Sequence, residues 1–474
     1  MDLSFSFKKI FNIHNLYFFF MIIASVLSMI DKVGVFILLL MIFIAPFLFD
    51  KKKNGQLLNK LLIFFMVYLP FYTLIRVSLV AQGLSTLSGF FNYLRDFLIL
   101  VMLIITSIKS KMKDFRIKPV GLIITFNYFY GFLLSIINGY PSLGLTGLHL
   151  TLMPILIYFI VKSNFVTVKS ETFYSLFLRI AFVIAVVGLF CYYARPDYYR
   201  SMFVINDESN NALSYVRFVS VFFTPNVCGC FFACSLCVAL SLLIYKKNFA
   251  YLILILLFIF CLALTLSRGS WAFGLIAIVV TIFLLKPIVG LGLLPMFLFF
   301  FLIISINTEL LVNADIFMLD VIIKRIESLF DFKNISAYER VNYWKTAMSI
   351  LKDAPFGFGI GVSSVAQVSR GISTKLDVID GFYIKTIVET GIFGIFFLIS
   401  FVFWTLNKSI IAYKNKKNYV TMTGLLFVIG FLVQSFGSNT FDFVCAAPLV
   451  WISLGYAIKE QKKIVQTKIA FLKI

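Results

Sequence analysis

The chain has 474 residues, of which 61% are hydrophobic and 18% aromatic. A soluble globular protein of this length needs a largely polar surface, so the composition excludes one. The formal net charge of +21 comes from short basic clusters between apolar runs. This distribution argues against a nucleic-acid partner and is typical of the loops of membrane proteins.

A spanning helix needs about 20 predominantly apolar residues to cross a hydrocarbon core about 30 Å thick. The sequence contains such runs in succession and therefore predicts an all-α, polytopic integral membrane protein with about 12–14 transmembrane helices. We interpret the first run as a retained span, because no cleavable signal peptide is evident. We expect spans at approximately 14–30, 33–49, 61–80, 89–108, 119–137, 148–161, 173–193, 219–245, 249–266, 270–285, 288–306, 381–406, 419–437 and 440–458.

The basic residues between these spans indicate an orientation. With the N-terminus in the cytoplasm, alternation of the spans places most Lys and Arg residues in cytoplasmic segments and leaves the opposite side close to neutral. This is the asymmetry that the positive-inside rule describes. We therefore expect both termini in the cytoplasm.

The longest interval without a spanning run divides the chain into three predicted regions, of which it is the middle one. Residues 1–306 contain helices 1–11, residues 307–380 form a large loop outside the cytoplasm, and residues 381–474 contain helices 12–14 and a cytoplasmic tail. Within the loop, the apolar residues that follow Arg340 recur at helical spacing and predict an amphipathic helix. The loop and the start of the next span hold nearly half of the 21 acidic side chains.

Four of the seven cysteines lie in one apolar run, at a spacing that zinc sites do not use. A spanning helix distributes them over several faces, so we interpret them as small buried residues: Cys228, Cys230, Cys234 and Cys237. We expect no metal site and no cofactor.

Charged residues within spans are candidates for function, because hydrocarbon tolerates a charge only where it is paired or wet. Arg76 lies in the third span, and Arg95 and Asp96 lie near the outer end of the fourth. Arg179 lies near the cytoplasmic face, where its charge can reach the headgroups.

A further set of charges belongs to the last three spans. Lys385 and Glu389 are four residues apart, so they share a helix face and could neutralise one another. That pairing is equally compatible with a structural and a functional role. Asp442 lies near the outer end of the last span.

Three arginines, Arg217, Arg268 and Arg340, lie near the predicted outer face. A guanidinium group forms forked hydrogen bonds that match phosphate oxygens and keeps its charge in proteins. Together the three predict a diphosphate clamp. Any single one of these arginines could instead anchor the protein to the phosphate groups of membrane lipids.

Two residues near the same face are candidates for a general base. Asp380 precedes the twelfth span, where it could equally cap the helix. His149 lies at the outer end of the sixth span. A nearby glycine-rich run, 357–361, could cradle phosphate through backbone N–H groups, or it could be a tight turn that returns the chain to the membrane.

Several of these residues belong to a set of motifs between about 217 and 394. The motifs are RFVSVFFTPN from Arg217, TLSRGSWAFG around Arg268, RVNYW from Arg340, and DGFYIKTIVETGIFG from Asp380 with Tyr383 and Glu389 inside it. In sequence and order they resemble the O-antigen ligase and polymerase superfamily. The resemblance implies a metal-independent, GT-C-like glycosyltransferase of the bacterial inner membrane. Its substrates would be undecaprenyl-diphosphate-linked glycans at the periplasmic face.

Within that superfamily the resemblance assigns the arginines at positions such as 217, 268 and 340 to the diphosphate. It also suggests Arg95, Tyr383 and Glu389 as substrate-binding residues. Ligases carry His-Asn where this chain has Asp380-Gly381, a departure that favours a polymerase of the Wzy type. An O-antigen ligase that transfers glycan to lipid A-core, a protein O-oligosaccharyltransferase, and a flippase of lipid-linked glycans stay open as alternatives. Membrane lipid and a chain-length regulator are the further partners implied.

Overall fold

The computed structural model describes most of the chain. The described residues are 12–50, 57–110, 119–199, 217–222, 224–288 and 378–471, together with 342, 344, 345, 347–349, 351–364, 366, 367, 371–374 and 376. Within them the protein is all-α and no strand is present. The prediction of an all-α, polytopic membrane protein is confirmed.

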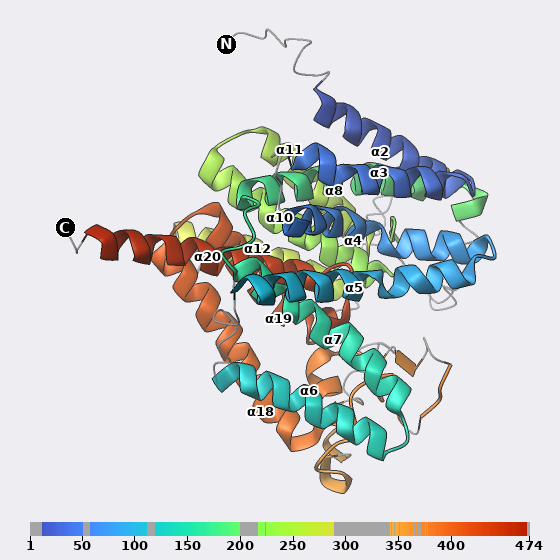
Figure 1. The fold of residues 1–474 in the computed structure, drawn as a ribbon, viewed down its shortest axis with the longest axis vertical. Coiled ribbons are helices and arrows are strands. Elements are labelled where there is room, and N and C mark those ends of the chain that lie inside the picture. Colours follow the sequence, from blue (N-terminus) through green and yellow to red (C-terminus); the bar gives the residue numbers. More distant parts are fainter. Residues whose placement is uncertain are drawn as a thin grey trace, which may run out of the picture.

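The helices follow the order of the predicted spans (Figure 1). They are α2 (Ile13–Ile30), α3 (Gly34–Phe49), α4 (Leu57–Ala81), α5 (Ser85–Ser110), α6 (Pro119–Ile137), α7 (Pro141–Lys162), α8 (Ser170–Ala194), α10 (Pro225–Lys246), α11 (Ala250–Leu264), α12 (Arg268–Leu285), α18 (Phe382–Asn415), α19 (Tyr419–Gln434) and α20 (Ala447–Phe471), with a 3₁₀ turn η3 (Thr440–Asp442).

Within the described residues, eight helices are long and apolar enough to cross a membrane: α2, α4, α5, α7, α8, α10, α12 and α18. Shorter apolar helices occupy 34–49, 121–137, 250–264 and 419–434. Every predicted span except 288–306 coincides with a helix, and that one falls almost entirely outside the described residues. Large apolar side chains face outward on several helices, as lipid contact requires, among them Phe47, Ile108 and Phe403.

Two predicted spans begin later than expected. The eighth begins at Pro225, because Thr224 accepts a hydrogen bond from the Val227 N–H and proline occupies the first helical position. The last begins at Ala447, because the preceding residues form η3 and a turn. Both segments therefore place non-helical backbone at the predicted outer ends of the helices.

Helix α7 joins two parts of the molecule. It packs against α5 and α20 on one side and against α6 on the other, and α6 packs against α18. Figure 1 shows α6 and α18 side by side, below the stack that α2, α3, α4 and α5 form with the central helices. The α4–α5 and α6–α7 turns lie toward the right of that view and the end of α20 toward the left, consistent with alternating spans.

The glycine-rich run is a wedge between these helices. Gly357, Gly359 and Gly361 all have positive φ, at 83°, 107° and 86°, a region that only glycine adopts without strain. The run packs against α6, α7 and α18, where an added Cβ would meet Ser135, Gly147 or the backbone at Glu389. The chain thus makes a tight turn back into the helices.

The backbone N–H groups of this run are all used within the protein. Those of Gly357, Phe358, Gly359 and Ile360 donate to the carbonyl oxygens of Ala354, Val388, Glu389 and Gly131. The fifth, of Gly361, donates to Glu389 Oε1 at 2.9 Å. The phosphate-cradle interpretation is therefore wrong, because no donor is left for a ligand.

The cysteines of α10 are fully buried, and none of the seven cysteines of the chain forms a disulfide. Cys228, Cys230, Cys234 and Cys237 lie among aromatic neighbours such as Phe231 and Phe232. This burial agrees with their interpretation as small core residues.

Candidate functional site

The first part of the site is the turn between α11 and α12. Arg217 lies along it and donates from Nε to the Thr265 carbonyl oxygen at 3.1 Å and from Nη2 to that of Leu266 at 3.3 Å. The last carbonyls of a helix lack intrahelical partners and carry partial negative charge, so a guanidinium group is stabilised there. Arg217 therefore fixes the residues that immediately precede Arg268.

The turn itself holds an unusual backbone conformation. Leu266 has φ of 50°, and holding a non-glycine residue there costs on the order of 1–3 kcal/mol. The hydrogen bond from Arg217 to the Leu266 carbonyl stabilises this conformation. Arg268 follows as the first residue of α12 and is largely buried, with 8% of its surface exposed.

Asn226 and Ser267 join the start of α12 to the start of α10. Ser267 donates from Oγ to Asn226 Oδ1 at 2.8 Å, and the hydroxyls of Ser267 and Ser270 are 3.0 Å apart. Gln434, the last residue of α19, donates from Nε2 to Ser270 Oγ at 3.0 Å. Two of the predicted motifs, TPN and SRG, are thus bonded to each other.

The segment 434–438 also holds the start of α18. The Phe382 N–H donates to the carbonyl oxygens of Ser435 and Ser438, at 3.0 and 3.3 Å. On the α12 side, a Cβ added to Gly269 would lie 3.4 Å from Gln434 Cγ and 3.8 Å from Ser438 Oγ. One short segment therefore contacts both the residue after Arg268 and the helix that begins after Asp380.

Asp380 is exposed immediately before α18. The helix begins at Phe382, and its N-cap residue is Gly381, with φ of 117° and no capping side chain. The prediction that Asp380 caps this helix is therefore wrong, because the chain enters the helix one residue later. The Asn439 amide donates to the Ile379 carbonyl at 2.8 Å and fixes the backbone beside it.

Two further predicted residues of α18 bind protein groups. Tyr383 donates from its hydroxyl to the Leu432 carbonyl oxygen at 2.7 Å and packs its ring on Phe436. Glu389 is buried and accepts from the Gly361 N–H and, at 3.4 Å, from the Ser363 hydroxyl. In this structure, therefore, Tyr383 holds α18 against α19, and Glu389 holds α18 against the glycine-rich run.

Lys385 forms its ion pair with Asp442, and both side chains are almost fully buried. Asp442 is the last residue of η3, which brings it to α18 from 57 positions along the chain. The carboxylate that lies one helical turn away, Glu389, binds the glycine-rich wedge instead. This ion pair ties the segment after α19 to α18.

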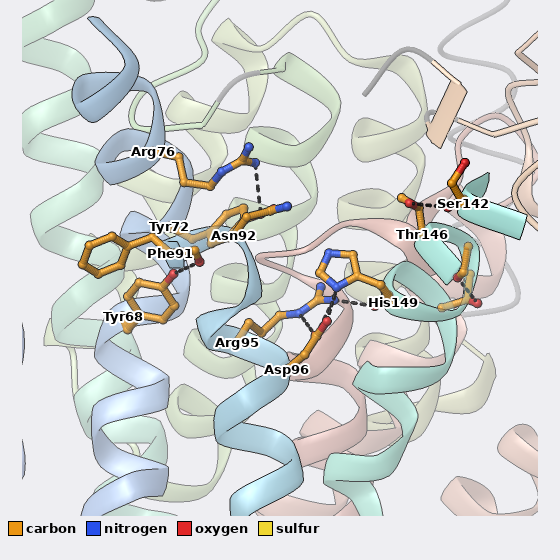
Figure 2. A network of polar contacts seen from close by, with 12 residues as sticks. Tyr68, Tyr72, Arg76, Phe91, Asn92, Arg95, Asp96, Ser142, Thr146 and His149 are labelled. Carbon is orange, nitrogen blue, oxygen red and sulfur yellow. Dashed lines mark hydrogen bonds and ion pairs between the residues drawn. The ribbon is translucent and has the colours of Figure 1, made fainter. Parts of the chain in front are cut away.

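Arg95 and His149 meet in a separate cluster between α5 and α7 (Figure 2). Arg95 donates from Nε to Asp96 Oδ1 at 2.8 Å, and its Nη2 lies 3.3 Å from His149 Nδ1. The same His149 nitrogen contacts Asp96 Oδ2. The sequence predicted these residues near the outer helix ends, whereas the structure places them about two to three helical turns inside α5 and α7 and brings all three together. Arg340 lies outside the described residues.

Several partners in the site escaped the sequence interpretation. Gln434 is an isolated amide in an apolar run, and that isolation is the signal in the sequence that marks it. Ser270 carries no signal of its own, because a serine in a spanning helix usually bonds its own backbone. Among the described residues, no group of three His, Cys, Asp or Glu side chains is placed to hold a metal ion.

Comparison with known proteins bears on the same region. Residues 252–399 match the model of a family described as O-Antigen ligase. The match includes Arg268, Asp380, Tyr383 and Glu389, and it begins within α11 and ends within α18. No curated protein matches the chain. Residues 252–399 are thus similar to the O-antigen ligase/polymerase superfamily, whose members are membrane glycosyltransferase-like enzymes of polysaccharide synthesis, and the match supports the resemblance that the motifs indicate.

Proposed function

We propose that the chain polymerises undecaprenyl-diphosphate-linked oligosaccharide repeat units into O-antigen or a related surface polysaccharide at the periplasmic face of the bacterial inner membrane. The observation that carries this proposal is the convergence at segment 434–438. Arg268 begins α12 on one side of it, Asp380 precedes α18 on the other, and Arg217 fixes the turn before Arg268.

The proposed reaction is a glycosyl transfer with diphosphate as the leaving group. An acceptor hydroxyl of the next lipid-linked unit attacks the anomeric carbon of the growing chain. The bond to the acceptor oxygen forms, the bond to the phosphate oxygen breaks, and undecaprenyl diphosphate departs with the electron pair. Arg217, Arg268 and Arg340 stabilise the charge that develops on that diphosphate, a contribution that is usually large in enzymes.

The proton of the acceptor hydroxyl needs a base. Asp380 is exposed beside the segment that contacts the start of α12, so we assign it this role. Because guanidinium groups carry the leaving-group charge in this scheme, we propose that the reaction requires no metal ion.

A ligase and a flippase are the two alternative functions. A ligase would transfer finished glycan to lipid A-core, and the Asp380-Gly381 pair, in place of His-Asn, argues against it. A flippase would concentrate charge at the membrane midplane. The charges of the proposed site, Arg217, Arg268 and Asp380, lie next to helix ends.

Deletion of the gene tests these functions, with lipopolysaccharide resolved on a gel and the lipid-linked glycans extracted in parallel. For a polymerase we expect core that carries a single repeat unit, and the full ladder after complementation with the wild-type gene. Loss of all surface glycan with accumulation of lipid-linked polymer would instead identify a ligase. Single units retained on the cytoplasmic face would identify a flippase.

A further inference from the structure

The cluster between α4, α5 and α7 carries more positive charge than its surroundings neutralise. Arg95 is completely buried, about three helical turns from the start of α5. Its Nε atom is paired with Asp96 and its Nη2 faces His149, but its Nη1 is buried without a hydrogen-bond partner among the described residues. One donor of a membrane-buried guanidinium group is thus left over.

A second arginine faces the same cluster from α4. Arg76 donates from Nη1 to the Tyr72 hydroxyl at 3.1 Å and lies over the Tyr72 ring, while its Nε is also buried with no hydrogen-bond partner in the described part of the chain. The Tyr72 hydroxyl in turn donates to Asn92 Oδ1. Within the part of the chain that the structure describes, no carboxylate lies within ion-pair distance of Arg76, and Asp96 is the only acid in the network.

Figure 2 shows Arg95 beside His149 and Arg76, from the neighbouring helix α4, beside Tyr72 and Asn92. Arg76, Asn92 and His149 are half-buried and form the reachable rim, whereas Arg95 lies behind them and supports His149. Two guanidinium groups against one carboxylate leave an excess positive charge within spans. Such an excess is costly unless an anion completes it. The forked donors of a guanidinium group match phosphate oxygens.

This cluster is connected to the segment that contacts Arg268 and Phe382. Cys445, which follows η3, lies with its Sγ 3.7 Å from Thr73 Oγ1 on α4. The connection between α19 and α20 thus contacts the start of α12 through Gln434 and contacts α4, the helix that carries Arg76, through Cys445. Arg268 on α12 and Arg76 on α4 therefore belong to helices that the same connection contacts.

We propose that Arg76 and His149, with Arg95 supporting His149 from behind, form a second diphosphate site, which holds the lipid diphosphate of the acceptor. The proposal rests on the proposed polymerase function. In that reaction both substrates carry a lipid diphosphate: the donor's leaves, while the acceptor's stays attached. Arg217 and Arg268 bind the leaving diphosphate, and the Arg76 cluster binds the one that is retained.

Binding stoichiometry tests this assignment without any sugar. The full-length protein in nanodiscs is titrated with undecaprenyl diphosphate, and bound molecules are counted by native mass spectrometry. We expect two molecules on the wild-type chain, one on Arg76→Ala, one on Arg268→Ala and none on the double variant. Arg76→Lys, which keeps the charge but loses the fork, should bind the second molecule at least tenfold more weakly.

Arg179→Ala is the matched control. Arg179 also lies within a span, bonds a neutral side chain, Asn15, and lies over an aromatic ring, that of Phe18. This variant should still bind two molecules. Unchanged melting temperatures of all variants would exclude misfolding as the cause of lost binding.

Three outcomes would overturn the second site. In the first, the wild-type chain binds a single molecule, which Arg268→Ala removes and Arg76→Ala does not. In the second, Arg76→Ala still binds two molecules. In the third, phosphatidylglycerol at equal concentration displaces the second molecule. The first two leave the proposed function standing, and the third identifies the cluster as a phospholipid anchor. Absence of any binding to the wild-type chain would count against both proposals.

Discussion

At the scale of single residues, the two described arginines of the proposed clamp have different surroundings. Arg217 gives its donors to the carbonyls of Thr265 and Leu266, so its removal would also release the turn. Arg268 begins α12, and the serine before it is fixed by Asn226. A substitution at Arg268 therefore tests binding chemistry with less disturbance of the backbone.

We predict that Arg268→Ala and Arg268→Lys each reduce polymer by about 100-fold, the effect of removing one well-placed donor to a developing negative charge. Lysine should not restore activity, because it keeps the charge but loses the fork. The measurement is the intensity of the glycan ladder from complemented deletion strains, normalised to protein on an immunoblot. Arg179→Ala serves as the control with a normal ladder. A normal ladder in both Arg268 variants would remove this residue from the clamp.

At the scale of elements, the glycine-rich wedge and the start of α18 depend on backbone that other residues cannot adopt. Gly359 has φ of 107°, and an added Cβ would meet the backbone of Ser135 on α6. Inside α18, Gly391 departs from helical geometry with φ of 60°, and a Cβ there would meet the Pro355 carbonyl. The kink of α18 and the wedge therefore fit together.

Gly83 offers a matched comparison for this element. Its φ of 78° is also positive, but an added Cβ would meet nothing within 4 Å. Gly83→Ala should thus cost only the conformational penalty of about 1–2 kcal/mol. Gly359→Ala adds a clash with backbone, so we predict a clearly larger fall in melting temperature, measured by intrinsic fluorescence in detergent. Equal shifts in the two variants would show that the wedge does not pack as described.

The elements also show where sequence interpretation succeeds and fails. Hydropathy predicted the spans because a hydrocarbon core selects length and composition directly. It extended the last span back to 440, because Phe441 and Phe443 are apolar. The structure forms η3 there, since Asp442 pairs with Lys385. The nearer acid, Glu389, was the expected partner of Lys385, and only tertiary placement decides between two carboxylates.

At the scale of the whole molecule, the proposed function requires that the helix ends beside Arg217, Arg268 and Asp380 face the periplasm. The convergence of Arg217, Arg268 and Asp380 lies at the ends that the positive-inside rule places outside the cytoplasm. The same alternation puts the α4–α5 turn outside, and the end of α12 and the α18–α19 connection inside. The orientation is therefore a single hypothesis that fixes every site at once.

Cysteine labelling tests this orientation. All seven native cysteines are buried, so they should give little background. We predict that Ser85→Cys reacts with a membrane-impermeant maleimide in intact spheroplasts, whereas Lys286→Cys and Lys414→Cys react only after lysis. All three introduced positions are exposed in the structure. The reverse pattern would place the proposed site in the cytoplasm.

The central claim, that this chain joins lipid-linked units to one another, is tested most directly by reconstitution. The purified protein is placed in liposomes with undecaprenyl-diphosphate-linked units extracted from the deletion strain, in the presence of EDTA. We predict a ladder of longer lipid-linked glycans, with one undecaprenyl diphosphate released for each bond formed and no ladder from Arg268→Ala. The claim would be contradicted if no elongation occurred and preformed glycan were transferred only after lipid A-core was added.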